Sequence, residues 1–170
     1  MTIIQRYIDL CLMKVGPESI PASTSLLKLT LFAYLAIGIA TSSIDMSLPM
    51  SIFSSLADTL FMVASIALLL RARGLQVRVQ QTLSAMAGAG CCLGIVGFPI
   101  IAWFSQTPET EQANSYAMLF MVIIMFWSLM VTSHIFRYAL DIKVFTAMMI
   151  TIIYTALSLL VLGLTMSGVA

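Results

Sequence analysis

The sequence predicts an all-α polytopic membrane protein, a bundle of five transmembrane helices preceded by a short amphipathic helix at the membrane interface. Hydrophobic residues make up 61% of the 170 residues, and the mean hydropathy is +1.06. Charged residues make up only 9%, against about 25% in a soluble domain. A soluble chain of this size could not hide so much apolar surface, because too many of its positions face water. Most of the chain must therefore contact lipid.

Residues 1–25 are predicted to form the interfacial helix and a turn. Gln5, Arg6 and Asp9 lie on one face of that helix and apolar residues surround the rest, which is typical of a helix in the plane of the interface. Gly16-Pro17 ends the helix, and Pro21 prevents an early restart. We expect no cleavable signal peptide here, because charges interrupt the apolar pattern.

Five stretches reach the roughly 20 apolar residues that are needed to cross the hydrocarbon core. They are residues 26–44, 50–70, 82–104, 116–136 and 144–166. The links are short, so residues 1–170 are predicted to form a single transmembrane domain. Pro49, Gly74 and Pro108 lie in or beside links, where helices stop or restart. Within the third span, Phe98-Pro99 predicts a kink or an early helix end.

The charges predict an orientation. All eight basic residues fall on one side of the five spans: Arg6, Lys14, Lys28, Arg71, Arg73, Arg78, Arg137 and Lys143. The opposite side holds Asp45, Glu109 and Glu111 and no Lys or Arg. By the positive-inside rule, the basic side and the N-terminus are cytoplasmic, and five spans place the C-terminus on the far side.

Asp58 is the first candidate for a functional residue, because it lies near the middle of the second span. An acid at that depth raises the free energy of membrane insertion by about 3 kcal/mol, whereas each strongly apolar residue of the span lowers it by about 0.5 kcal/mol. The span can therefore still insert. Helical spacing places the acid in a stripe with four serines: Ser51, Ser54, Ser55 and Ser65. That stripe should face protein or water.

Two interpretations of Asp58 stay open. In the functional one, it binds a proton or a cation together with Tyr154, Thr151 and Thr155 of the fifth span and Ser128 of the fourth, at a similar depth. In the structural one, a protonated or hydrogen-bonded acid ties helices together, or the span begins deeper than we place it.

The third span carries small residues at heptad-like spacing: Ala87, Gly90, Gly94 and Gly97. Gly90-x-x-x-Gly94 matches the motif that lets helix backbones approach closely in lipid. The packing partner is either another span of this chain, which we favour, or a second protein.

The remaining reactive residues do not predict a metal site. Three methionines share a face of the fourth span: Met118, Met121 and Met125. Sites for Cu(I) usually add Cys or His at the same depth, whereas Cys91 and Cys92 lie on another span. His134, the only histidine, shares a face with Tyr138 and Asp141. It makes either a pH-sensitive contact or no specific one.

The sequence contains no catalytic signature. H-E-x-x-H, G-x-S-x-G and phosphate-binding glycine loops are absent, as is a pair of intramembrane carboxylates. No basic run could follow a nucleic-acid backbone. We therefore expect no enzyme activity, no cofactor and no nucleic-acid partner.

The order of parts, with the segment Lys14 to Lys28 (KVGPESIPASTSLLK), resembles the bacterial members of the Yip-domain superfamily of five-span inner-membrane proteins. The resemblance implies a non-enzymatic role in a bacterial inner membrane, with a periplasmic C-terminus. Our first hypothesis is a structural, scaffold or accessory subunit that binds other membrane proteins or itself within the bilayer. The alternative is a small transporter or ion-conducting subunit that uses Asp58.

Overall fold

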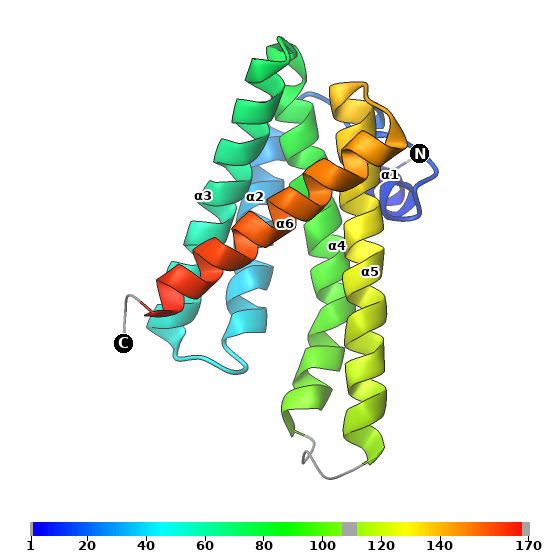
Figure 1. Ribbon diagram of the computed structural model, residues 1–170. Coiled ribbons are helices and arrows are strands. Elements are labelled where there is room, and N and C mark those ends of the chain that lie inside the picture. Colours follow the sequence, from blue (N-terminus) through cyan, green and yellow to red (C-terminus); the bar gives the residue numbers. More distant parts are fainter. Residues whose placement is uncertain (1, 107–111, 168–170) are drawn as a thin grey trace.

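The computed structural model describes residues 2–106 and 112–167, and its regular elements in that part of the chain are all helical (Figure 1). The short helix α1 (Ile3–Cys11) and the 3-10 turn η1 (Pro17–Ser19) come first. Five long helices follow: α2 (Thr24–Ser42), α3 (Leu48–Ala72), α4 (Val79–Gln106), α5 (Gln112–Leu140) and α6 (Val144–Ser167). A second 3-10 turn, η2 (Gln76–Arg78), precedes α4. All five long helices are long and apolar enough to cross a membrane, which confirms the predicted fold class.

The helix ends follow local chain chemistry. Pro49 lies in the first turn of α3, where its missing N–H costs nothing. Gly74 follows α3 with a φ of 71°, a left-handed conformation that glycine adopts without strain. Of the two alternatives predicted at Phe98-Pro99, a kink or an early helix end, the early end is wrong, because α4 continues through Pro99 to Gln106. Pro108, Glu109 and Glu111 lie outside the described residues.

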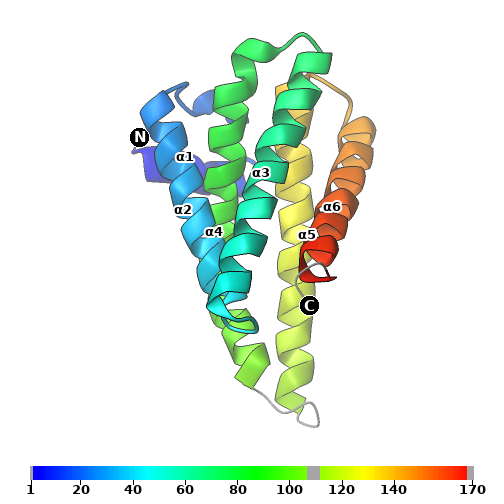
Figure 2. The same cartoon turned by 90° about the vertical axis from the view of Figure 1, so that its left-hand side faces the viewer.

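Helix α4 is the centre of the bundle, since it packs against α1, α2, α3 and α5. Residues 82–89 of α4 are all buried. Helix α6 contacts α5 near its start and crosses obliquely to α3 (Figures 1 and 2). The α3–α4 and α5–α6 links lie at the same end of the bundle as the start of α2 (Figure 2). This shared end is called the basic end below, because the Lys and Arg residues of these segments lie there.

The distribution of side chains is the one expected in lipid. Large apolar residues cover the outside; Phe32 and Leu68 are 70% exposed, for example, and Phe145 is 71% exposed. Many buried residues are small or hydroxylated instead: Ser51, Ser54, Ser84, Ser133 and Thr151. Lipid solvates apolar side chains as well as a protein core does, so helices in a membrane pack through small residues and hydrogen bonds.

The N-terminal segment is held against α4 and α5 by side chains that bond its backbone. Gln81 donates to the carbonyls of Glu18 and Ile20, at 3.0 and 2.6 Å. The indole of Trp127 donates to the Cys11 carbonyl at 2.9 Å. A ring nitrogen of His134 lies 2.9 Å from the Val15 carbonyl, which is a contact between helix α5 and this segment.

The apolar residues in and beside helix α1 lie on two of its faces, one buried and one exposed. Tyr7, Leu10 and Cys11 are buried against the bundle, and four others are about half exposed or more: Ile3, Ile4, Ile8 and Leu12. At its start, Thr2 and Gln5 form a reciprocal capping box. A helix that is apolar on two faces, with Arg6 and Asp9 on a third, suits the boundary between headgroups and acyl chains.

Candidate functional site

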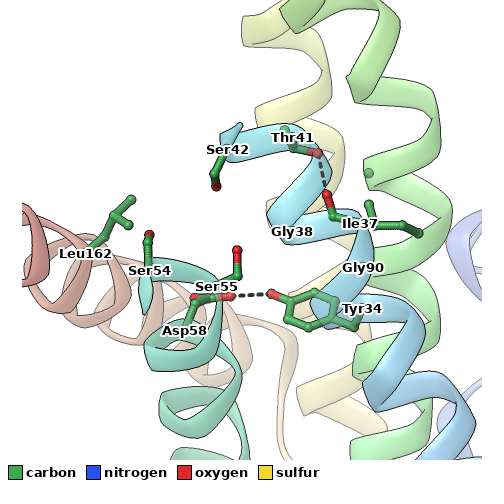
Figure 3. A pocket seen from close by; sticks show the side chains of 11 residues that line it. Tyr34, Ile37, Gly38, Thr41, Ser42, Ser54, Ser55, Asp58, Gly90 and Leu162 are labelled. Carbon is green, nitrogen blue, oxygen red and sulfur yellow. Dashed lines mark hydrogen bonds between the residues drawn. The ribbon is translucent and has the colours of Figure 1, made fainter. Parts of the chain in front are cut away.

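Asp58 lies in α3, and both of its carboxylate oxygens accept hydrogen bonds from other helices. The Tyr34 hydroxyl of α2 donates to Oδ2 at 2.6 Å, as Figure 3 shows, and the Ser158 hydroxyl of α6 donates to Oδ1 at 2.9 Å. One acidic side chain therefore connects three helices.

Asp58 has no cationic partner among the described residues. The ion pair that these residues form is Lys14 with Asp9, 3.9 Å apart at the basic end. The Asp58 side chain is partly buried, and its two hydrogen-bond donors are neutral hydroxyls, so neither donor compensates the charge of a carboxylate. The site therefore consists of one acidic side chain held by two neutral hydroxyl donors.

A cavity of about 320 Å³, called the outer cavity here, lies on the side of Asp58 away from the basic end. Its lining includes Ile37, Gly38 and Thr41, which lie beyond Tyr34 in α2, and Ser54 and Ser55, which precede Asp58 in α3. Both sets of residues lie farther from the basic end than the Tyr34–Asp58 pair, because α2 runs away from that end and α3 runs toward it. Figure 3 shows these side chains around the pair.

A second cavity, of about 190 Å³, extends from the pair toward the basic end and is called the inner cavity. Its lining includes Met62 of α3, Met86 of α4 and Ile135 of α5, all nearer the basic end than Asp58. Tyr34, Asp58 and Gly90 line both cavities. The hydrogen bond between Tyr34 and Asp58 therefore lies where the two cavities meet.

The structure brings together most, but not all, of the site residues expected from the sequence. Ser54 and Ser55 are buried beside Asp58 in the outer cavity. Tyr154 lines the inner cavity, together with Ser128 and Thr155. Thr151 does not reach either cavity: it is 2% exposed, and its hydroxyl donates to the Ala147 carbonyl one turn earlier, at 2.9 Å. The hydrogen bond of the Thr151 hydroxyl is thus made within its own helix.

Two members of the site were missed by sequence reasoning, Tyr34 and Ser158. A signal existed for Tyr34, because it lies in the interior of the first span, whereas tyrosines in membrane proteins favour the interfaces. Ser158 follows Tyr154 by four residues and so shares its helical face. No comparable signal identified it as a donor to Asp58.

The glycines of α4 differ in their surroundings. A Cβ added to Gly90 would lie 2.5 Å from Cε2 of Tyr34, and one on Gly94 would lie 2.5 Å from Cγ2 of Ile37. Both glycines therefore face α2 of the same chain. Gly97 departs from the predicted packing role: a Cβ there would meet nothing within 4 Å. It lines a cavity of about 290 Å³ instead, which also includes Thr41 of α2 in its lining.

The described residues contain no group of three or more His, Cys, Asp or Glu side chains that could hold a metal ion. Met118 and Met125 of α5 are 60% and 52% exposed.

The fold and site define the chain as a multi-pass α-helical membrane protein with a hydrogen-bonded acid inside the bundle. A comparison with family models, curated proteins and solved structures finds no match. The resemblance to the Yip-domain superfamily therefore stays a prediction.

Proposed function

We propose that this chain is a small, non-enzymatic transport protein that binds a proton or another cation at Asp58. The observation that carries the proposal is the position of the Tyr34–Asp58 hydrogen bond between the outer and inner cavities. A carrier needs one binding group that can be reached from either side in turn, and Asp58 lines both cavities. Intramembrane acids commonly serve proton and ion pathways.

We further propose that the protein resides in a bacterial inner membrane with its basic end in the cytoplasm. The positive-inside rule supports this orientation, because the links at that end carry the basic residues. The outer cavity would then face the periplasm and the inner cavity the cytoplasm. The lipid bilayer is the surrounding partner, and a second copy of the chain could complete the path.

The test is a flux assay in proteoliposomes. Protein would be reconstituted under a proton, Na⁺ or K⁺ gradient, with a pH-sensitive dye in the lumen and protein-free liposomes as the blank. We expect Asp58→Asn to reduce the flux at least about tenfold, because the neutral amide accepts neither a proton nor a cation, and Asp45→Asn, in the α2–α3 link, to leave it unchanged. Wild-type vesicles that move no ion under any of these gradients would overturn the proposal.

A structural or accessory role is the second candidate. It is favoured by the fact that both oxygens of Asp58 are already bonded within the chain, as in a tie that fixes α2, α3 and α6. This role predicts that Asp58→Asn lowers the thermal midpoint without affecting any flux, and that a stoichiometric partner co-purifies in mild detergent. The two candidates thus differ in which measurement responds to the same substitution.

A further inference from the structure

We infer that the outer cavity and the apolar cavity beside it form a binding site for an amphipathic amine, a molecule with one protonated amino group and an apolar body. The inference rests on the proposed role of Asp58 as a cation-binding group and specifies the class of cation.

The size of the space is the first reason. A proton needs no cavity, and a water molecule occupies only about 30 Å³ of liquid. The outer cavity measures about 320 Å³, which reaches the range of small-molecule sites, about 300 to 1,000 Å³. The site can therefore hold an organic molecule.

The polar chemistry of the outer cavity is the second reason. Besides Asp58, its lining includes the Ser55 hydroxyl, which is buried and has no hydrogen-bond partner. Ser55 is 6% exposed, and its Oγ lies close to Gly38, where a Cβ would approach it to 3.1 Å (Figure 3). A buried hydroxyl without a partner costs about 1 to 3 kcal/mol. An ammonium group could donate to the Ser55 oxygen and to Asp58 together.

The apolar neighbour is the third reason. The cavity of about 290 Å³ shares Thr41 and Gly94 with the outer cavity, so the two adjoin between α2 and α4. The remaining residues of its lining are mostly apolar: Leu93, Ile100, Ile101, Met121, Ile124 and Met125. A charged head beside Asp58 would thus have its apolar body among aliphatic side chains and flexible thioethers, which adapt to different shapes.

The test uses purified protein in lipid nanodiscs, titrated with 4-phenylbutylamine by calorimetry, with empty nanodiscs as the blank. The neutral isostere 4-phenylbutanol is the matched ligand control. We expect saturable binding of the amine and at least about tenfold weaker binding of the alcohol, because only the amine carries the charge. Asp58→Asn should remove this preference, and Ser55→Ala should weaken amine binding several-fold.

A second variant keeps the test valid if Asp58→Asn does not fold. Gly97→Leu places a side chain in the apolar cavity, where a Cβ meets nothing within 4 Å, and leaves Asp58 untouched. We expect this variant to lose amine binding while it keeps its thermal midpoint and its proton flux. Equal binding of amine and alcohol, the absence of saturable amine binding, or unchanged binding to Gly97→Leu would overturn the inference. If proton flux through Asp58 persists in that case, only the ligand class is wrong; if flux is also absent, the proposed function fails with it.

Discussion

The hydroxyl of Tyr34 and the carboxylate of Asp58 lie 2.6 Å apart, on neighbouring helices, and both residues line the outer and the inner cavity. A short hydrogen bond to an acidic group is among the stronger ones in a protein interior. The pair therefore stabilises the contact between α2 and α3 and forms part of the lining of both cavities.

The first prediction concerns Tyr34→Phe, which removes this donor and keeps the ring. We expect the free energy of unfolding to fall by about 1 to 2 kcal/mol, because a partly buried acid loses one of its two hydrogen-bond donors. A double-mutant cycle with Asp58→Asn should give a coupling energy of about 1 kcal/mol. Thermal denaturation in detergent measures both.

Tyr154→Phe is the matched control for that cycle, because Tyr154 lines the inner cavity but the two hydrogen bonds of Asp58 come from other residues. We expect its coupling to Asp58→Asn to stay within about 0.5 kcal/mol. Equal coupling for both tyrosines would contradict the assignment of Tyr34 as the specific donor.

The second prediction compares two glycines of one helix. In Gly90→Ala the new methyl group overlaps the Tyr34 ring, so we expect a loss of about 1 to 3 kcal/mol and a weaker contact with Asp58. In Gly97→Ala nothing lies within 4 Å of the methyl group, and the better helix propensity of alanine should leave stability unchanged or raised. Circular dichroism melts would measure the difference. The same loss in both variants would show that the close approach at Gly90 is not specific.

The sequence was sufficient to predict the fold class, because each span is a local property of about 20 consecutive residues in lipid. Asp58 was also identifiable, since the cost of an acid at mid-span is local as well. The hydrogen-bond partners of Asp58 were not identifiable from the sequence. Tyr34 precedes Asp58 by 24 residues and Ser158 follows it by 100, so both contacts depend on helix order, rotation and tilt.

Gly97 and Thr151 are the converse case, because the sequence predicted for each a role that its surroundings in the structure do not support. Gly97 continues the spacing of Gly90 and Gly94, but it faces a cavity instead of a side chain of α2. Thr151 has the depth expected of a site residue, yet its hydroxyl bonds a carbonyl of its own helix. Spacing along a helix gives the face of a residue, whereas the length and path of the neighbouring helix decide what that face meets.

The third prediction is a pH dependence that arises from Tyr7. Burial, with smaller contributions from the thiols of Cys91 and Cys92, raises the pKa of Tyr7 to about 12 from its ordinary value of 10.0. Below pH 10 the phenol is protonated whether α1 is docked or undocked. Between pH 10 and 12 it loses its proton only when undocked, so the stability of the docked state falls as the pH rises.

Tyr7→Phe tests this dependence. The Tyr7 hydroxyl is buried without a hydrogen-bond partner, so we expect the variant to be more stable than the wild type by about 1 kcal/mol at pH 8. The gap in thermal midpoint should widen between pH 10 and 11.5, whereas Tyr138→Phe, at a half-exposed tyrosine of α5, should follow the wild type. Parallel curves for Tyr7→Phe and wild type at all pH values would rule out a role for Tyr7 ionisation.

The fourth prediction concerns the docking of the N-terminal segment against α4 and α5. Cys11 is 3% exposed, and its carbonyl accepts a hydrogen bond from Trp127. A hydrogen bond with the Cys92 thiol and burial raise the pKa of the Cys11 thiol far above its ordinary range, so it stays protonated and unreactive while α1 is docked. A maleimide should therefore modify Cys11 only after α1 leaves α4.

Trp127→Phe keeps an aromatic ring but removes the indole donor, and the loss of about 1 kcal/mol should increase the rate of Cys11 labelling about fivefold. Mass spectrometry of the labelled peptides would separate Cys11 from Cys91 and Cys92. Phe126→Leu is the control, because Phe126 is 58% exposed on the same helix and should not change the rate. Fast labelling of Cys11 in the wild type would mean that the segment is undocked in the membrane, and that its buried face, Tyr7, Leu10 and Cys11, is available to bind another protein.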